Sequence, residues 1–129
     1  MKFDWRRFTE TDYKKMLNNE EDFGQVYVGD ICIELVVEFY GVIDVKSNTQ
    51  KTENILMYNF YVPYEDTGYG YKDDVLPYDY ADGDGMDIPY GLSYDEFKIK
   101  AEKLFMDYIE SYKGNYSLVE HANRPLEIW

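Results

Sequence analysis

The chain has very little cysteine, since Cys32 is the only one among its 129 residues. A single cysteine cannot form a disulfide within the chain, and it excludes CxxC redox and zinc motifs. Long apolar runs are also missing, because no stretch approaches the roughly 18 apolar residues that a membrane-spanning helix needs. The opening segment, MKFDWRRFTETD, carries acids and polar groups where a signal peptide has an apolar stretch. These absences predict a soluble, cytoplasmic protein.

Basic residues are scarce as well. Thirteen Lys and Arg stand against 26 Asp and Glu, which gives a formal net charge of −13. Free nucleic acid and anionic membranes are polyanions, and proteins bind them through clustered Lys and Arg. The charge balance therefore opposes both as direct ligands and favours a partner with a basic surface or groove.

Motifs for catalysis and cofactor binding are absent too. The chain contains neither GxxxxGK[ST] nor GxGxxG, so no phosphate-binding loop is predicted. Cys32 and His121 are the only candidates for a thiol nucleophile and its base. Cys32 lies between apolar residues, which indicates a core cysteine with a raised pKa, and His121 lies in a polar tail and is predicted at the surface. The sequence therefore predicts no catalytic residue, no metal ligand and no cofactor.

What the chain does contain is core material. Its hydrophobic fraction is 45% and its aromatic fraction is 19%, values that oppose disorder. We expect one domain over residues 1–129, of the α+β class. The predicted architecture is a three- to four-stranded antiparallel meander packed with an N-terminal helix and a C-terminal amphipathic helix, plus a long acidic loop rich in Tyr and Gly.

The first half of the chain predicts a helix followed by strands. Thr9 or Thr11 can cap a helix that ends near Phe23-Gly24. A strand over 25–28 is followed by a Gly29-Asp30 turn signal. From residue 31 to about 45, apolar and other residues alternate, with a possible bulge at Gly41. This alternation places Glu34 and Glu38 on the outer face of a half-buried strand. A polar connection over 46–52 then precedes a strand over 55–62.

Residues 64–91 differ from the rest and predict a long loop. The segment reads YEDTGYGYKDDVLPYDYADGDGMDIPYG, and neither a helical nor a strand period persists in it. Residues 79–87 resemble the centre of a calcium-binding EF-hand loop, with Asp82 and Asp84 at ligand positions. The first and last ligand positions would be Tyr80 and Gly91, where Asp and Glu are required. An irregular calcium loop therefore remains an alternative.

The C-terminal part opens with a capping box. Ser93 and Glu96 have the spacing for it, and an apolar stripe then predicts an amphipathic helix that ends near Gly114. Residues 116–119 are predicted to form a short strand, and Trp129 is expected to anchor the terminus.

The excess negative charge is local. Residues 64–96 hold ten acids and one base, a net charge of −9, while the other 96 residues hold 16 acids and 12 bases, a net charge of −4. Clustered like charges oppose compaction unless they are solvated or paired with a partner. The predicted partner-binding residues are Glu34, Glu38, Glu65, Asp66, Asp73, Asp74, Asp79, Asp82, Asp84 and Asp87.

Three functions fit these features. In size, charge and abundance of Tyr, the chain resembles phage-encoded inhibitors such as anti-CRISPR and anti-restriction proteins, although no motif is shared residue by residue. Such an inhibitor would present carboxylates to the basic groove of a nucleic-acid-binding enzyme. An immunity protein or antitoxin that neutralises a basic toxin is the first alternative. A calcium- or ligand-binding module is the second.

Overall fold

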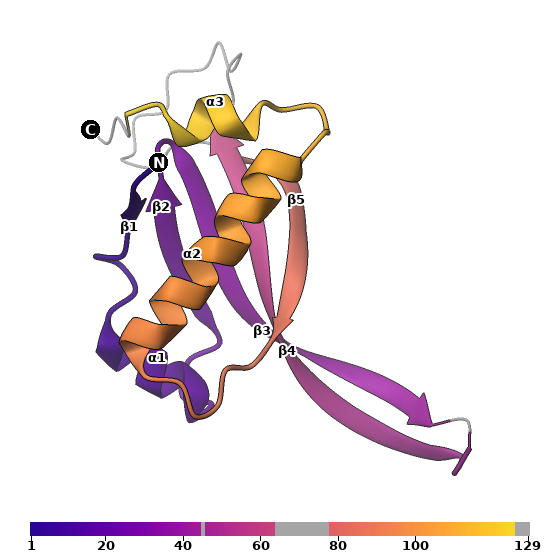
Figure 1. The fold of residues 1–129 in the computed structure, drawn as a ribbon. Coiled ribbons are helices and arrows are strands. Elements are labelled where there is room, and N and C mark those ends of the chain that lie inside the picture. Colours follow the sequence, from indigo (N-terminus) through magenta and orange to yellow (C-terminus); the bar gives the residue numbers. More distant parts are fainter. Residues whose placement is uncertain (45, 64–77, 126–129) are drawn as a thin grey trace.

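The computed structural model describes residues 1–44, 46–63 and 78–125 and has the α+β architecture that the sequence predicts (Figure 1). Its five strands form one antiparallel sheet in the order β1-β2-β3-β4-β5, so each strand pairs with the next along the chain. The elements are β1 (Phe3–Asp4), α1 (Glu10–Leu17), β2 (Phe23–Val28), β3 (Ile31–Asp44), β4 (Thr49–Pro63), β5 (Tyr78–Asp87), α2 (Tyr94–Ser111) and α3 (Leu118–Ala122). The sheet has five strands, rather than three or four, because β1 and β5 were not predicted.

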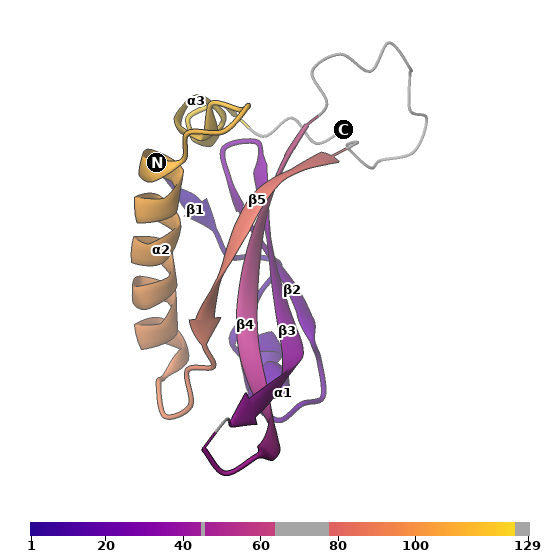
Figure 2. The same ribbon diagram turned by 90° about the vertical axis from the view of Figure 1, so that its right-hand side faces the viewer.

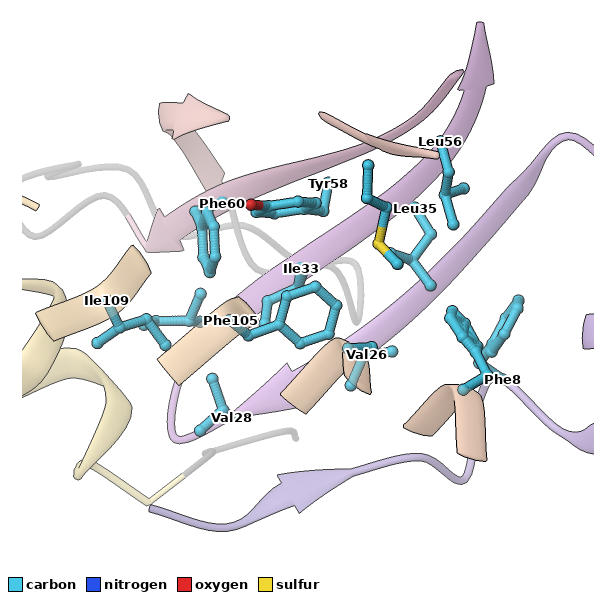
Figure 3. Packing of buried hydrophobic residues seen from close by; sticks show 14 of the residues in the cluster. Phe8, Val26, Val28, Ile33, Leu35, Leu56, Tyr58, Phe60, Phe105 and Ile109 are labelled. Carbon is cyan, nitrogen blue, oxygen red and sulfur yellow. The ribbon is translucent and has the colours of Figure 1, made fainter. Parts of the chain in front are cut away.

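Helix α2 packs along one face of the sheet (Figures 1 and 2), and the core lies between them. Phe60 and Phe105 are fully buried there (Figure 3). The ring of Phe60 stacks on that of Tyr108 in α2, with centroids 4.6 Å apart and planes 6° apart. Burying an aromatic or large aliphatic side chain of this kind contributes about 1.5–3 kcal/mol. Leu56, Tyr58, Phe60 and Val62 of β4 are all buried, and the predicted strand over 55–62 lies within β4.

Two connections differ from the prediction. Helix α1 ends at Leu17 because Asn19 adopts a left-handed conformation with φ 58°, and Phe23-Gly24 starts strand β2 instead. Strands β3 and β4 pair without a break through Gly41, so the predicted bulge is wrong. Thr49 opposes Asp44 in the same ladder, which shortens the polar connection predicted over 46–52.

Both longer helices begin at polar caps. Thr9 caps α1, with its hydroxyl oxygen accepting from the amide of Asp12 and its own amide donating to the Asp12 carboxylate at 2.8 Å. Ser93 caps α2 and accepts from the amide of Glu96 at 3.2 Å, as predicted. The Glu96 carboxylate accepts from the Ser93 hydroxyl at 3.0 Å instead of from the Ser93 amide, so the predicted capping box forms only in its Ser93 half. Caps of this kind contribute about 1 kcal/mol each.

The C-terminal tail corrects two predictions. Residues 118–122 form helix α3, where a strand over 116–119 was expected. His121, predicted at the surface, is only 3% exposed, and its Nδ1 lies 2.8 Å from the Asp30 carboxylate in the β2–β3 turn. The Asp30 amide also donates to the His121 carbonyl. Gly29 has φ 57°, and a Cβ there would lie 2.1 Å from that carbonyl oxygen, so this turn needs glycine for two reasons. Trp129 lies outside the described residues.

The predicted loop over 64–91 is wrong over 78–87, which form the edge strand β5. Its register with β4 shifts at one point, because Phe60 opposes Asp82 while Tyr61 opposes Tyr80, and Ala81 is the extra residue. Residues 64–77 lie outside the described part of the chain. No helix among the described residues is long and apolar enough to cross a membrane.

Candidate partner-binding surface

The face of the sheet opposite α2 carries no helix over β3, β4 and β5 among the described residues (Figure 2). Directly opposed residues of antiparallel strands point to the same side, so the register identifies the side chains on this face. We call it the open face. Tyr27 and Cys32 share this side but are buried. The open face is defined by the residues of this side that are not buried, which are Phe23 and Gln25 of β2, Glu34, Val36 and Glu38 of β3, Ile55, Met57, Asn59 and Tyr61 of β4, and Tyr80, Gly83, Gly85 and Asp87 of β5.

Acidic and apolar side chains are interleaved on the open face. Glu38, Ile55 and Asp87 oppose one another across three strands, so a carboxylate stands at either side of an apolar residue. Phe23 and Tyr80 are 45% and 51% exposed, which leaves much of each ring in solvent. Protein interfaces are enriched in aromatic residues and Met, and recognition of a charged partner adds acids of the right sign. The open face combines both properties.

Glu34 is the most constrained acid of this face. It is half-buried, and partial burial raises the pKa of its carboxyl, while a hydrogen bond from the Asn59 side chain lowers it by less. Asn59 is the residue directly opposite on β4. The raised pKa means that the ionised form of Glu34 is less favourable in the folded protein than in the unfolded chain. A cationic group from a partner would relieve that cost.

Tyr61 of β4 and Tyr80 of β5 oppose each other on the open face, and burial and nearby carboxylates raise the pKa of both phenols. The rings of Tyr61 and Tyr80 lie 5.5 Å apart between centroids. Burial and then Asp82 and Glu38 raise the pKa of Tyr80, and burial and then Glu34 raise that of Tyr61. Both phenols therefore stay neutral donors at neutral pH, with hydroxyls in a field that attracts cations.

Strand β5 presents its other acids on the side of α2. Asp84 accepts from the Tyr58 hydroxyl at 3.4 Å. Asp82 lies beside Tyr108, and hydrogen bonds from the Tyr108 hydroxyl and from the backbone of Gly83 lower the pKa of its carboxyl. Burial, and then the Asp82 carboxylate, raise the pKa of Tyr108. These acids line the seam between β5 and α2 and not the open face.

The predicted binding residues are thus divided. Glu34, Glu38 and Asp87 lie together on the open face, whereas Asp82 and Asp84 lie on the α2 side. Asp79 belongs to β5, but its side chain is not among those that the structure describes. Glu65, Asp66, Asp73 and Asp74 lie wholly outside the described residues. The sequence treated residues 79–87 as one loop and so missed this division.

Strand geometry also changes the calcium interpretation. Asp82 and Asp84 each accept from the backbone amide of the next residue, at 2.9 and 2.8 Å, within an extended strand. An EF-hand loop instead wraps its carboxylates around one point. In the described part of the chain, no three His, Cys, Asp or Glu side chains gather as metal ligands do.

The two reactive side chains that the sequence singled out are both buried. Cys32 is 5% exposed, as predicted for a core cysteine, and burial raises the pKa of its thiol to about 11. A thiol with this pKa is protonated at neutral pH and is a poor nucleophile. The neighbouring Tyr27 is covered by Arg7, whose guanidinium carbon lies 4.7 Å from the ring centroid. His121 is held by Asp30 as described above.

Sequence reasoning did not include the apolar members of the open face among the binding residues. Val36, Met57 and Tyr61 are half-buried there, and the alternation that placed Glu34 outside also placed Val36 outside. Comparison with known protein families, with curated proteins and with solved structures finds no match to this chain.

Proposed function

We propose that this protein is an acidic inhibitor that occupies the basic groove of a nucleic-acid-binding enzyme. The observation that carries the proposal is the open face, where Glu34, Glu38 and Asp87 stand among exposed aromatic and apolar side chains. Basic grooves bind the phosphate backbone mainly through charge, so a row of carboxylates can compete for them. The apolar side chains would supply the desolvated contacts that give such a complex its lifetime.

Charge also supports a foreign partner over a second copy of the chain. Packing two open faces together would bring Glu34, Glu38 and Asp87 of one copy toward those of another. Like charges that meet at an interface weaken association by a free energy on the order of several kcal/mol. A net charge of −13 adds a long-range repulsion to this. A basic surface, in contrast, is attracted to these acids.

The test is capture from the native host followed by competition. The wild-type protein is compared with a triple variant, E34Q/E38Q/D87N, and with a matched control, E20Q/D95N/E110Q. The control removes the same charge from exposed positions on α2 and after α1. We expect the captured enzyme to bind nucleic acid, to be released by added DNA or RNA, and to be lost from the triple variant only.

Salt provides a second readout on the same complex. Exposed charges are screened beyond about 8 Å at physiological ionic strength, so affinity should fall steeply between low and high salt. The triple variant should show a shallower salt dependence than the control variant. A captured protein that both variants retain equally, or that nucleic acid does not displace, would overturn the proposal. A toxin encoded beside this gene would assign the same surface to an immunity protein.

A further inference from the structure

A cavity of about 370 Å³ lies between the C-terminal end of α2 and strand β5. Its volume is at the small end of the range for ligand pockets, which suits a single side chain or a small molecule. The lining residues are Asp82 of β5 and Tyr108, Ser111, Tyr112, Lys113, Gly114 and Asn115. None of them belongs to the open face.

Two tyrosines one helical turn apart form the aromatic wall. The rings of Tyr108 and Tyr112 lie 6.3 Å apart between centroids, with planes 25° apart. Tyr108 is fixed from behind by its stack on the buried Phe60. Tyr112 extends over Gly114, since a Cβ at that glycine would lie 2.1 Å from the Tyr112 hydroxyl oxygen. The wall is therefore held in place before any ligand arrives.

A charged carboxylate stands beside this wall. Asp82 is exposed and accepts from the Gly83 amide at 2.9 Å, and the Tyr108 hydroxyl donates to the Gly83 carbonyl at 3.5 Å. The Gly83 amide orients the carboxylate and leaves it lone pairs for a further donor. No ion pair of the described chain involves Asp82.

The helix itself adds negative potential. Tyr112 is the C-cap of α2, and the last turn of α2 holds no basic residue. The carbonyl end of a helix carries a partial negative charge that favours a cation within the last turn. Lys113 follows directly and lines the cavity, so it is a resident cation with which any ligand must compete.

We propose that this cavity binds a guanidinium group, and that its natural occupant is an arginine side chain of the partner protein. A planar guanidinium can stack on tyrosine and donate to a carboxylate at the same time, whereas the compact lysine ammonium does only the second well. The cavity brings two tyrosine side chains, the carboxylate and the negative helix end together. That the arginine comes from a partner depends on the function proposed above, but binding of the group itself does not.

The first experiment uses small probes and amide NMR. Labelled protein is titrated with N-acetyl-L-arginine methylamide, and with the corresponding lysine and citrulline compounds. We expect saturable shifts at the amides of Gly83, Gly114 and Asn115 with the arginine compound. The neutral citrulline compound should cause none, and lysine should bind more weakly.

Variants locate the site. Asp82→Asn should weaken arginine binding about three- to fivefold, the range of an exposed charge pair. Asp95→Asn is the matched control, because it removes the same charge from the exposed first turn of α2, at the other end of the helix from the cavity, and should leave binding unchanged. Lys113→Gln should strengthen binding about twofold by removing the competing cation. Equal effects of Asp82→Asn and Asp95→Asn, or equal binding of all three probes, would overturn the guanidinium site.

The captured complex then shows whether the guanidinium group comes from a partner protein or from a free compound. If the partner inserts an arginine, Asp82→Asn should weaken the complex while the probe competes with it. A protein that binds the arginine probe through Asp82, but whose complex is insensitive to Asp82→Asn, has a site for a free guanidinium compound and not for a partner side chain. Loss of the complex in E34Q/E38Q/D87N is independent of that outcome, so the two proposals fail separately.

Discussion

On the α2 side of the sheet, Leu56 and Phe60 of β4 are 1% and 0% exposed, whereas Met57 and Tyr61, the next residues along the same strand, are only half-buried on the open face. Side chains that are one residue apart thus have different surroundings. The side that faces α2, which we call the covered face, holds the aromatic contacts that connect β4 to α2. The open face holds the acids of β3 and the glycines of β5.

This difference separates stability from recognition. Residues of the covered face are constrained by packing, because protein interiors are packed as densely as organic crystals and the loss of a single methylene lowers stability. Residues of the open face such as Met57 and Tyr61 are only partly buried and can change with smaller effects on the fold. A half-buried acid such as Glu34 at a position that could hold an apolar residue indicates a role other than stability. The following predictions test this separation.

The largest expected effect is at Phe60. Phe60→Ala removes a fully buried ring that stacks on Tyr108, and we expect it to lower the free energy of unfolding by about 3–5 kcal/mol. Tyr61→Ala, one residue along and on the open face, should lower it by about 1 kcal/mol or less. Urea unfolding followed by circular dichroism measures both. Similar losses would show that the open face is covered in solution.

Gly24 on the covered face and Gly85 on the open face allow the same comparison with substitutions that add volume instead of removing it. A Cβ on Gly24 would lie 2.4 Å from Cδ2 of Phe8, which is fully buried and cannot yield, so Gly24→Ala should cost about 1–3 kcal/mol. A Cβ on Gly85 would lie 3.0 Å from Cγ2 of Ile55 and 3.1 Å from Sδ of Met57, both side chains of the open face, and at an ordinary 4.0 Å from the Leu56 carbonyl oxygen. Gly85→Ala should therefore change stability by about 1 kcal/mol or less in either direction. Thermal unfolding of both variants checks this, and an equal loss would contradict it.

Alkaline pH should act through the covered face as well. Burial, followed by the nearby Asp84 carboxylate, raises the pKa of Tyr58 from 10.0 to about 12. A folded-state pKa above the unfolded value stabilises the fold fully below pH 10, and this contribution is lost as the pH rises toward 12. Tyr58→Phe should therefore lose less stability between pH 8 and pH 12 than the wild type.

The control for that experiment is Tyr90→Phe, because Tyr90 is 63% exposed. Its unfolding free energy should follow the wild-type pH dependence. If Tyr58→Phe and Tyr90→Phe behave alike, the Tyr58 hydroxyl does not contribute to alkaline unfolding.

The covered face could be predicted from sequence wherever the alternation was regular. Ile31, Ile33 and Leu35 indicated one side of β3, and Glu34 on the other side was placed correctly. Strand β5 was missed because Gly and Asp are depleted in strands. Pairing with β4 determines its conformation, and a single sequence does not reveal that pairing. For the same reason, Asp82 and Asp87 could not be assigned to opposite faces.

Contacts between distant segments explain the other errors. Helix α3 and the burial of His121 depend on the β2–β3 turn, where Asp30 binds the imidazole and Gly29 leaves room for the His121 carbonyl. The polar residues around His121 suggested solvent, since nothing in their local pattern indicates a partner 91 residues away along the chain. The cavity beside Asp82 was beyond prediction for a related reason, because it needs both β5 and the end of α2.

The smallest expected effect has the most direct bearing on function. Partial burial raises the pKa of Glu34, so its ionised form lowers the stability of the free protein at neutral pH. Glu34→Gln should therefore raise the free energy of unfolding at pH 7 by roughly a few tenths of a kcal/mol, because solvent screens a partly exposed charge. The gain should vanish as the pH falls below 4.5, the ordinary pKa of the carboxyl, where the wild-type side chain also becomes neutral. Urea unfolding at pH 7 and pH 4 measures the difference, with Glu110→Gln on the exposed side of α2 as the control. Stabilisation together with weaker partner binding would show that Glu34 is retained for recognition, whereas lower stability at pH 7 would show that it supports the fold.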